Sequence, residues 1–217
     1  VDFAEVGAVP VVAAVTNGID LKIIAVFMNR FNYLMVTLPD LKKPQDLKGK
    51  ALAIRRFGSG EEFATREALR RWGLDPDKDV RMVQVGLTVA RMVALLGRYV
   101  QASLLSPPQI VEVQRAGLKV MADLSDLDVE YAHYTLATRG PILVENRPLV
   151  ERFMKAYIDG IKFHRSHPEA DIPYLCKFSR QNDAELKLVY EDLRKRIREE
   201  PVPTAGGIQT IIKTLKT

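Results

Sequence analysis

The segment Gly58-Ser59-Gly60 is the part of this sequence best suited to hold a ligand. It follows the short apolar run 51–54 and precedes apolar residues at helical spacing, such as Ala64 and Ala68, so it predicts a strand, a tight turn and a helix. The first N–H groups of a helix have no partner inside the helix and can bind a polar or anionic group. A ligand could therefore meet free backbone N–H groups at this turn.

The same residues also support a purely structural interpretation. Ser59 and Glu62 have the S-x-x-E spacing of a capping box, in which the serine hydroxyl only closes its own helix. Glu61 and Glu62 would place negative charge in the first turn and offset the helix dipole, which argues against a highly charged anion. We expect these two acids to lie on a solvated face, and the sequence leaves both interpretations of Ser59 open.

Side chains near this turn and after later strands are further candidates. Arg55 or Arg56 could pair with an anionic head group, and strand alternation would let at most one of them face the ligand. Thr88 and Ser106 each follow a predicted strand, where they could contact ligand or serve as N-caps. The aromatic residues Phe31, Tyr33 and Phe57 could supply an apolar wall.

The histidines and the cysteine point to no metal, cofactor or catalytic residue. The one cysteine, Cys176, excludes an intrachain disulfide and a multi-cysteine metal site. His164 and His167 resemble solvated residues at a helix end, with no third metal ligand nearby in the sequence. His133 is expected to fill space between neighbouring tyrosines.

The composition is that of an ordinary globular protein. The chain has 217 residues, of which 47% are hydrophobic and 27% charged, with a net charge of +5. Its cations are interspersed with acids and no nucleic-acid motif is present, so we expect no nucleic-acid partner. The chain starts at Val1, in what looks like the tail of a strand, so we expect an N-terminal segment, with any signal or anchor, to lie upstream.

The order of predicted elements indicates an α/β fold. Between Asp46 and Ala122, strands alternate with helices, which predicts a parallel sheet with helices on both faces. From Asn146 onward the apolar spacing is helical only. The sequence therefore predicts an α/β lobe followed by a helical C-terminal part.

Several motifs together resemble the substrate-binding proteins of ABC transporters, in the group that binds nitrate, sulfonates, taurine and pyrimidine precursors. The motifs are Val1-Asp2-Phe3-Ala4 with Gly7 and Pro10, Asp46-Leu47-Lys48-Gly49-Lys50, Gly58-Ser59-Gly60, Arg66-Glu67-Ala68-Leu69, Gly73-Leu74-Asp75-Pro76 and Ser106-Pro107-Pro108. The likeness extends over nearly the whole chain, and the order of the motifs makes it fairly specific.

The resemblance implies a two-lobed, type II periplasmic-binding-protein fold with parallel-rich sheets flanked by helices. One lobe would be residues 38–134, and the other residues 1–37 with 135–217, lacking its N-terminal part. The chain would cross between the lobes near 36–37 and 134–135. A solute would bind in the interlobe cleft at turns that open helices. The residues implied are Ala8, Val9, Arg55, Gly58, Ser59, Gly60, Thr88 and Ser106.

Two departures from the family pattern bear on the ligand class. Gln101 stands where the family usually has an acid in a G-x-V-D-A strand. Arg55-Arg56-Phe57 adds bulk and charge before the glycine-rich turn.

We therefore expect an extracytoplasmic protein, periplasmic or anchored outside the cell, that captures a small polar or anionic organic solute. It would pass the solute to the permease of an ABC importer and touch the membrane only through that permease or an upstream anchor. Two alternatives remain. One is the effector-sensing domain of a transcription regulator, and the other is an enzyme similar to the pyrimidine-precursor synthases. The synthases need a cysteine-rich, histidine-bearing iron site, which a single cysteine disfavours.

Overall fold

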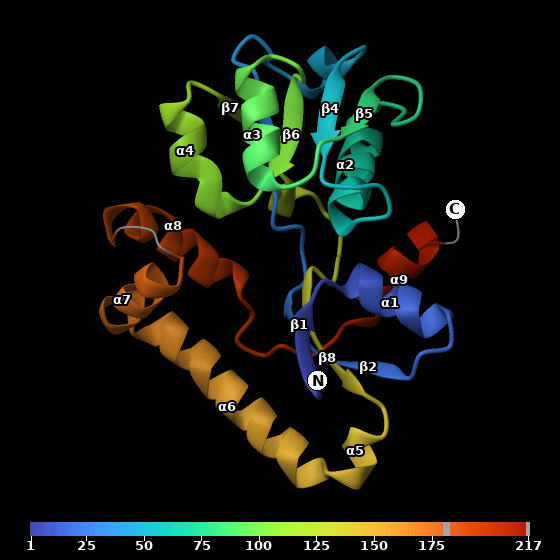
Figure 1. Cartoon of the computed structure of the whole chain (residues 1–217), viewed down its shortest axis with the longest axis vertical. Coiled ribbons are helices and arrows are strands. Elements are labelled where there is room, and N and C mark those ends of the chain that lie inside the picture. Colours follow the sequence, from blue (N-terminus) through green and yellow to red (C-terminus); the bar gives the residue numbers. More distant parts are fainter. Residues whose placement is uncertain (180–182, 216–217) are drawn as a thin grey trace. The chain divides into compact units, whose positions relative to one another are not determined.

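The chain divides into two compact units, each with its own sheet (Figure 1). The structure is a computed structural model that describes residues 1–179 and 183–215. Unit 1 consists of Val1–Arg30 and Val129–Thr217, and unit 2 is the continuous segment Phe31–Asp128. The chain passes between units a few residues earlier than the expected positions 36–37 and 134–135.

Unit 2 is built on a mixed five-stranded sheet with the strand order β5-β4-β6-β3-β7. The strands are β3 (Leu34–Thr37), β4 (Ala51–Ile54), β5 (Arg81–Gln84), β6 (Ala102–Leu105) and β7 (Lys119–Asp123). β4 runs parallel to β5 and β6, as the strand–helix alternation predicts. The carboxyl ends of these three strands therefore share one edge of the sheet.

One strand makes this sheet mixed, where the strand–helix alternation predicts parallel strands. β3 lies between β6 and β7 and runs antiparallel to both, with Leu34 opposite Leu105 and Asp123. Residues 34–37 therefore belong to unit 2, although the resemblance implied that they lie in the other lobe. Their hydrogen-bonded neighbours are all strands of unit 2, and that pairing decides the assignment.

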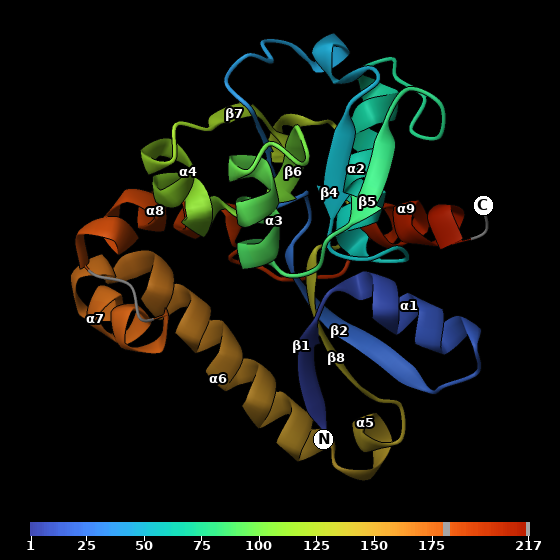
Figure 2. The ribbon, with the colours of Figure 1, turned by 45° about the horizontal axis from the view of Figure 1, so that its top comes forward.

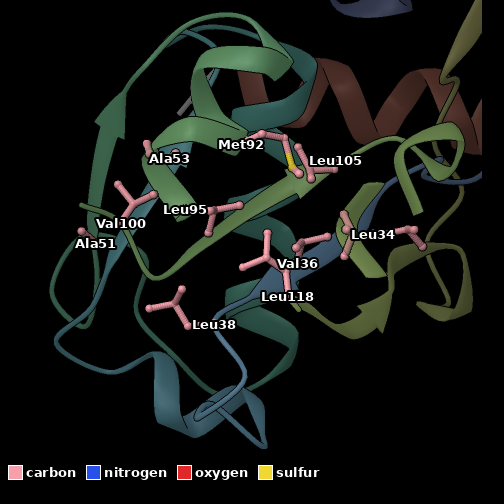
Figure 3. Packing of buried hydrophobic residues seen from close by; sticks show 12 residues of the cluster. Leu34, Val36, Leu38, Ala51, Ala53, Met92, Leu95, Val100, Leu105 and Leu118 are labelled. Atoms are coloured by element: carbon pink, nitrogen blue, oxygen red, sulfur yellow. The ribbon is translucent and has the colours of Figure 1, made fainter. Parts of the chain in front are cut away.

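The helices of unit 2 cover both faces of its sheet. They are α2 (Gly60–Arg71), α3 (Thr88–Leu96) and α4 (Ile110–Arg115), with the short 3-10 turns η1 (Pro44–Leu47), η2 (Pro107–Gln109) and η3 (Leu124–Asp126). α3 and α4 pack on one face, where Met92, Leu95 and Val113 meet Leu34 and Leu105 (Figure 3). α2 lies on the other face (Figure 2). Burial on both faces explains why β4 is apolar throughout.

Unit 1 contains a three-stranded sheet in the order β1-β8-β2. The strands are β1 (Phe3–Val6), β2 (Leu21–Met28) and β8 (Tyr134–Arg139), and β8 is antiparallel to both neighbours. α1 (Ala8–Thr16) connects β1 to β2. The central strand thus comes from the second segment of the unit, and its two partners come from the first.

The rest of unit 1 is helical, as the spacing after Asn146 predicts. The helices are α5 (Ile142–Glu145), α6 (Arg147–Ser166), α7 (Pro168–Ser179), α8 (Asp183–Arg196) and α9 (Ala205–Leu215). α6 places Ile161 and Tyr157 against Phe27 of β2, so this helix covers part of the sheet. Within the described ranges, every helix is too short or too polar to cross a membrane.

Candidate functional site

The turn between β4 and α2 has the geometry that its glycines predict. Gly58 has φ +73°, in the left-handed region where a side chain would be strained. Ser59 follows in an extended conformation as the N-cap of α2. By helix geometry, the N–H groups of Gly60 and Glu61 have no acceptor within α2. This turn therefore offers backbone donors at the carboxyl edge of the unit 2 sheet.

The hydroxyl of Ser59 caps α2, which confirms the interpretation that this serine closes its own helix. Its Oγ accepts a hydrogen bond from the Glu62 N–H at 3.2 Å and donates one to the Arg56 carbonyl at 2.7 Å. The Glu62 carboxylate accepts from the Gly58 N–H at 2.8 Å. The turn is therefore held rigid by its own side chains, and a ligand contact at Ser59 would share an already bonded hydroxyl.

The prediction that Glu61 and Glu62 form a solvated face is wrong. Glu61 is only 6% exposed and forms an ion pair with Arg91 of α3, which is 3% exposed. Burial raises the pKa of the Glu61 carboxyl, while Arg91 and the backbone N–H of Arg55 act in the opposite direction. Glu62 is paired with Arg66 at 2.6 Å. Both acids in the first turn of α2 are therefore matched by a cation.

Sequence reasoning missed Arg91 altogether. Its Nη2 lies 3.4 Å from the Thr88 Oγ1, while its Nη1 contacts Glu61, so one guanidinium joins the first turns of α2 and α3. The available signal was a single charge inside an otherwise largely apolar helix, 88–96, next to the apolar residues that the helix buries. A lone arginine on a buried helix face requires an acidic partner.

Arg55, Arg56 and Phe57 are all exposed beyond the end of β4. The expectation that alternation lets at most one arginine face a ligand does not apply, because the strand ends at Ile54. The Arg55 N–H donates to the buried Glu61 carboxylate at 3.2 Å, which fixes the backbone and leaves the guanidinium at the surface. Two cationic side chains thus flank the start of α2.

Thr88 and Ser106 lie on the same sheet edge, after β5 and β6, but neither hydroxyl caps a helix. The N-cap of α3 is Leu87, and Thr88 is already its first helical residue, where its Oγ1 contacts Arg91 instead. Ser106 occupies the N-cap position of η2, and its side chain makes no capping hydrogen bond. The expectation of an N-cap is therefore wrong for Thr88, whereas Ser106 has the predicted N-cap position without the capping hydrogen bond.

Ala8 and Val9 belong to unit 1, where they open α1. Their side chains are buried, at 0% and 6% exposure. A ligand could therefore contact these two residues only through backbone N–H groups. The other six residues predicted to contact ligand lie at the carboxyl edge of the unit 2 sheet.

Two histidines outside that edge, His133 and His164, are held by contacts within the protein. His133 is buried between the rings of Tyr131 and Tyr134, and burial lowers its pKa to about 3. The prediction that His164 is solvated is wrong, because its Nδ1 lies 2.6 Å from the Asp171 carboxylate. Within residues 1–179 and 183–215, no group of three His, Cys, Asp or Glu side chains could hold a metal ion.

Two other features lie away from the predicted contacts. A largely apolar pocket of about 260 Å³ belongs to unit 1, where Val6, Val11 and Ala137 line it. Gln101 precedes β6 at the opposite end of the unit 2 sheet, where its amide bonds the Ala51 N–H at 3.0 Å and the Arg98 carbonyl at 3.3 Å. Gln101 therefore links the start of β4 to the start of β6, whereas the candidate site lies at the opposite edge of the sheet.

The arrangement of mixed sheets flanked by helices is that of the periplasmic binding proteins. It is similar to the periplasmic aliphatic sulphonate binding protein SsuA from Escherichia coli, with a TM-score of 0.84 and 22% identity over 100% of this chain and 73% of that one. The alkanesulfonate-binding protein SsuA from Xanthomonas axonopodis pv. citri, bound to MOPS, gives a TM-score of 0.79 and 18% identity over 100% and 74%.

A less similar sequence has the same fold. The ligand-binding component of an ABC-type import system from Staphylococcus aureus, with zinc bound, gives a TM-score of 0.79 at 13% identity, over 100% of this chain and 73% of that one. At these identities the likeness establishes the fold alone. No curated protein sequence matches the chain significantly.

The family is established by sequence. The family model described as "NMT1/THI5 like" matches residues 1–171, which is most of the chain. The protein therefore belongs to the NMT1/THI5-like family.

Proposed function

We propose that this protein is an extracytoplasmic solute-binding protein, not an enzyme, that captures a small anionic organic molecule for an ABC importer. The membership in the NMT1/THI5-like family and the fold of the sulfonate-binding proteins support this function. Its partner would then be a membrane permease, which would receive the solute from the ligand-bound protein. Any membrane contact would occur through that permease or through an anchor outside this sequence.

One observation carries the choice of an anionic solute. The two glutamates that would repel an anion at the start of α2 are each paired with an arginine, Glu61 with Arg91 and Glu62 with Arg66. The helix start then presents the N–H groups of Gly60 and Glu61, which have no acceptor inside the helix, and a favourable dipole. The exposed Arg55 and Arg56 come just before it in the chain. We propose that Gly58, Ser59, Gly60 and Arg55 contact the anionic group, with Thr88 and Ser106 beside it.

The first test is a thermal-shift and calorimetric screen of the purified protein. The panel contains sulfonates, carboxylates, nitrate, inorganic sulfate and phosphate, and neutral analogues of the organic anions. A ligand at about 100 times its Kd stabilises the folded state by about 2.7 kcal/mol. For a chain of this size that raises the Tm by roughly 5–11 °C. We expect this rise with one class of organic anions and none with the neutral analogues.

Two variants then locate the site. Arg55→Met is expected to weaken binding of the anion about tenfold or more, since it removes a cation beside the anionic group. Arg70→Met is the matched control, because this substitution also removes one exposed arginine charge, but at the far end of α2. Ser59→Trp should abolish binding by filling the turn. Equal losses in the two arginine variants, or wild-type affinity in Ser59→Trp, would remove this turn from the site.

A further inference from the structure

Two amide side chains at the same edge of the unit 2 sheet carry oxygen atoms without a hydrogen-bond donor. Asn32 is 5% exposed, and its Oδ1 is buried and unpartnered. Gln109, the last residue of η2, has a buried Oε1 that is also unpartnered. A buried acceptor left without a donor costs free energy, so native proteins supply a partner at almost every such position.

The strand register places the two amides at the sheet edge that also carries the candidate site. Leu34, the first residue of β3, pairs with Leu105, the last residue of β6. Asn32 lies just before β3, and Gln109 lies just after β6, so both flank this end of the same pair of antiparallel strands. Ser106, whose hydroxyl makes no capping hydrogen bond, lies between β6 and Gln109 in the chain.

Asn32 is also tied to the first turn of α2. The ring of Phe31 lies 5.9 Å from that of Phe63, and Phe31 is 1% exposed. The Phe63 N–H donates to the carbonyl of Ser59, the residue proposed to contact the anion. The segment that carries Asn32 therefore packs against the same turn that carries the predicted anion contacts.

We propose that Asn32 and Gln109 determine specificity by accepting hydrogen bonds from an O–H or N–H group of the solute. The preferred ligand is then an organic anion that carries a hydroxyl or ammonium group a short distance from its charged end. This inference rests on the proposed function, and it names residues and a substrate feature that the anion contacts alone do not supply.

The test compares three sulfonates of nearly equal size by calorimetry on the purified protein. They are propane-1-sulfonate, 2-hydroxyethanesulfonate and the zwitterionic 2-aminoethanesulfonate, which differ only in a terminal methyl, hydroxyl or ammonium group. We expect the two donor-bearing sulfonates to bind about tenfold or more tightly than propane-1-sulfonate, in line with one or two added hydrogen bonds.

Asn32→Leu keeps the side-chain shape and removes the amide, so this preference should fall to about one while propane-1-sulfonate binding is retained. Gln109→Met should reduce the preference in the same way. Gln114→Met is the matched control, because Gln114 is exposed on α4. Asn32→Asp keeps an acceptor and should retain the preference, most clearly for the ammonium compound, which covers the case that Asn32→Leu does not fold.

The outcomes separate the two proposals. Equal wild-type affinity for all three sulfonates overturns the proposed role of Asn32 and Gln109 in specificity and leaves the proposed capture of the anionic group intact. A folded Asn32→Leu variant with an unchanged preference does the same. Failure of the wild-type protein to bind any of these sulfonates, together with every other anion of the panel, overturns both.

Discussion

At the scale of single residues, burial strongly perturbs His133. Its ring is 5% exposed, its neighbours are the rings of Tyr131 and Tyr134, and burial lowers its pKa to about 3. In the unfolded chain the same imidazole has an ordinary pKa near 6.5. The folded protein therefore holds this histidine neutral throughout the range in which the unfolded chain binds a proton.

The sign of the pH effect follows from this difference. Below about pH 6.5 the unfolded state binds one more proton than the folded state, so the free energy of unfolding falls as the pH is lowered. Between pH 7 and pH 5 the loss from this one group is about 2 kcal/mol. Urea unfolding at the two pH values should show that loss in the wild type and a correspondingly smaller loss in His133→Phe.

The control for this experiment is His167→Phe. His167 is exposed and stacks on Phe163, so His167→Phe replaces an imidazole by a phenyl ring without disturbing a buried position. An undiminished pH dependence in a folded His133→Phe variant would show that other groups cause the acid sensitivity.

At the scale of elements, the buried pair Glu61–Arg91 holds the start of α2 to the start of α3. Both side chains are more than nine-tenths buried, and Glu61 also accepts from the Arg55 N–H. Removing one partner leaves the other charge buried and uncompensated, which typically costs about 3–5 kcal/mol. We expect losses of that order in Glu61→Gln and in Arg91→Met, measured by urea unfolding.

The double variant distinguishes a coupled pair from two independent positions. Glu61→Gln with Arg91→Met leaves no uncompensated charge, so its loss should be smaller than the sum of the single losses by about 1–3 kcal/mol. Losses that simply add would mean that the two charges act separately. The matched control is the partly exposed pair Arg71–Glu67 of the same helix, whose removal should cost less than about 1 kcal/mol.

The same elements show what local sequence patterns can and cannot predict. β4, the turn at Gly58 and the Ser59 cap of α2 follow from residues close together in the chain, and all three were predicted. The Glu61–Arg91 pair joins residues far apart in sequence, so the pattern around Glu61 alone indicated a solvated acid. Long-range pairing also decides the antiparallel insertion of β3, since a four-residue apolar strand is compatible with either direction.

The candidate site was predictable to a similar degree. The turns after β4, β5 and β6 could be located because parallel strands place their carboxyl ends on one edge. Which hydroxyls act as caps there depends on where each helix begins, and Thr88 falls one residue inside α3. Asn32 carried no signal in the sequence, because its burial arises only when β3 pairs with β6.

At the scale of the whole molecule, the two units differ in how the chain builds them. Unit 2 is one continuous segment, Phe31–Asp128, with a five-stranded sheet covered on both faces and a core of its own. All strand partners of β3 to β7 lie within that segment. We therefore expect the excised fragment 31–128 to fold by itself and to unfold cooperatively, with an unfolding enthalpy of about 60–80 kcal/mol.

Unit 1 provides the matching control, because its sheet is assembled from two separate segments. Both strands that pair with β8 come from residues 1–30, whereas β8 itself lies in the second segment. In an excised fragment 129–217 the central strand would have no partner, and Phe27 would be missing from the face that Ile161 covers. Calorimetry should then show a cooperative transition for 31–128 and none for 129–217. A cooperative transition in both fragments, or in neither, would mean that folding does not follow the strand pairing.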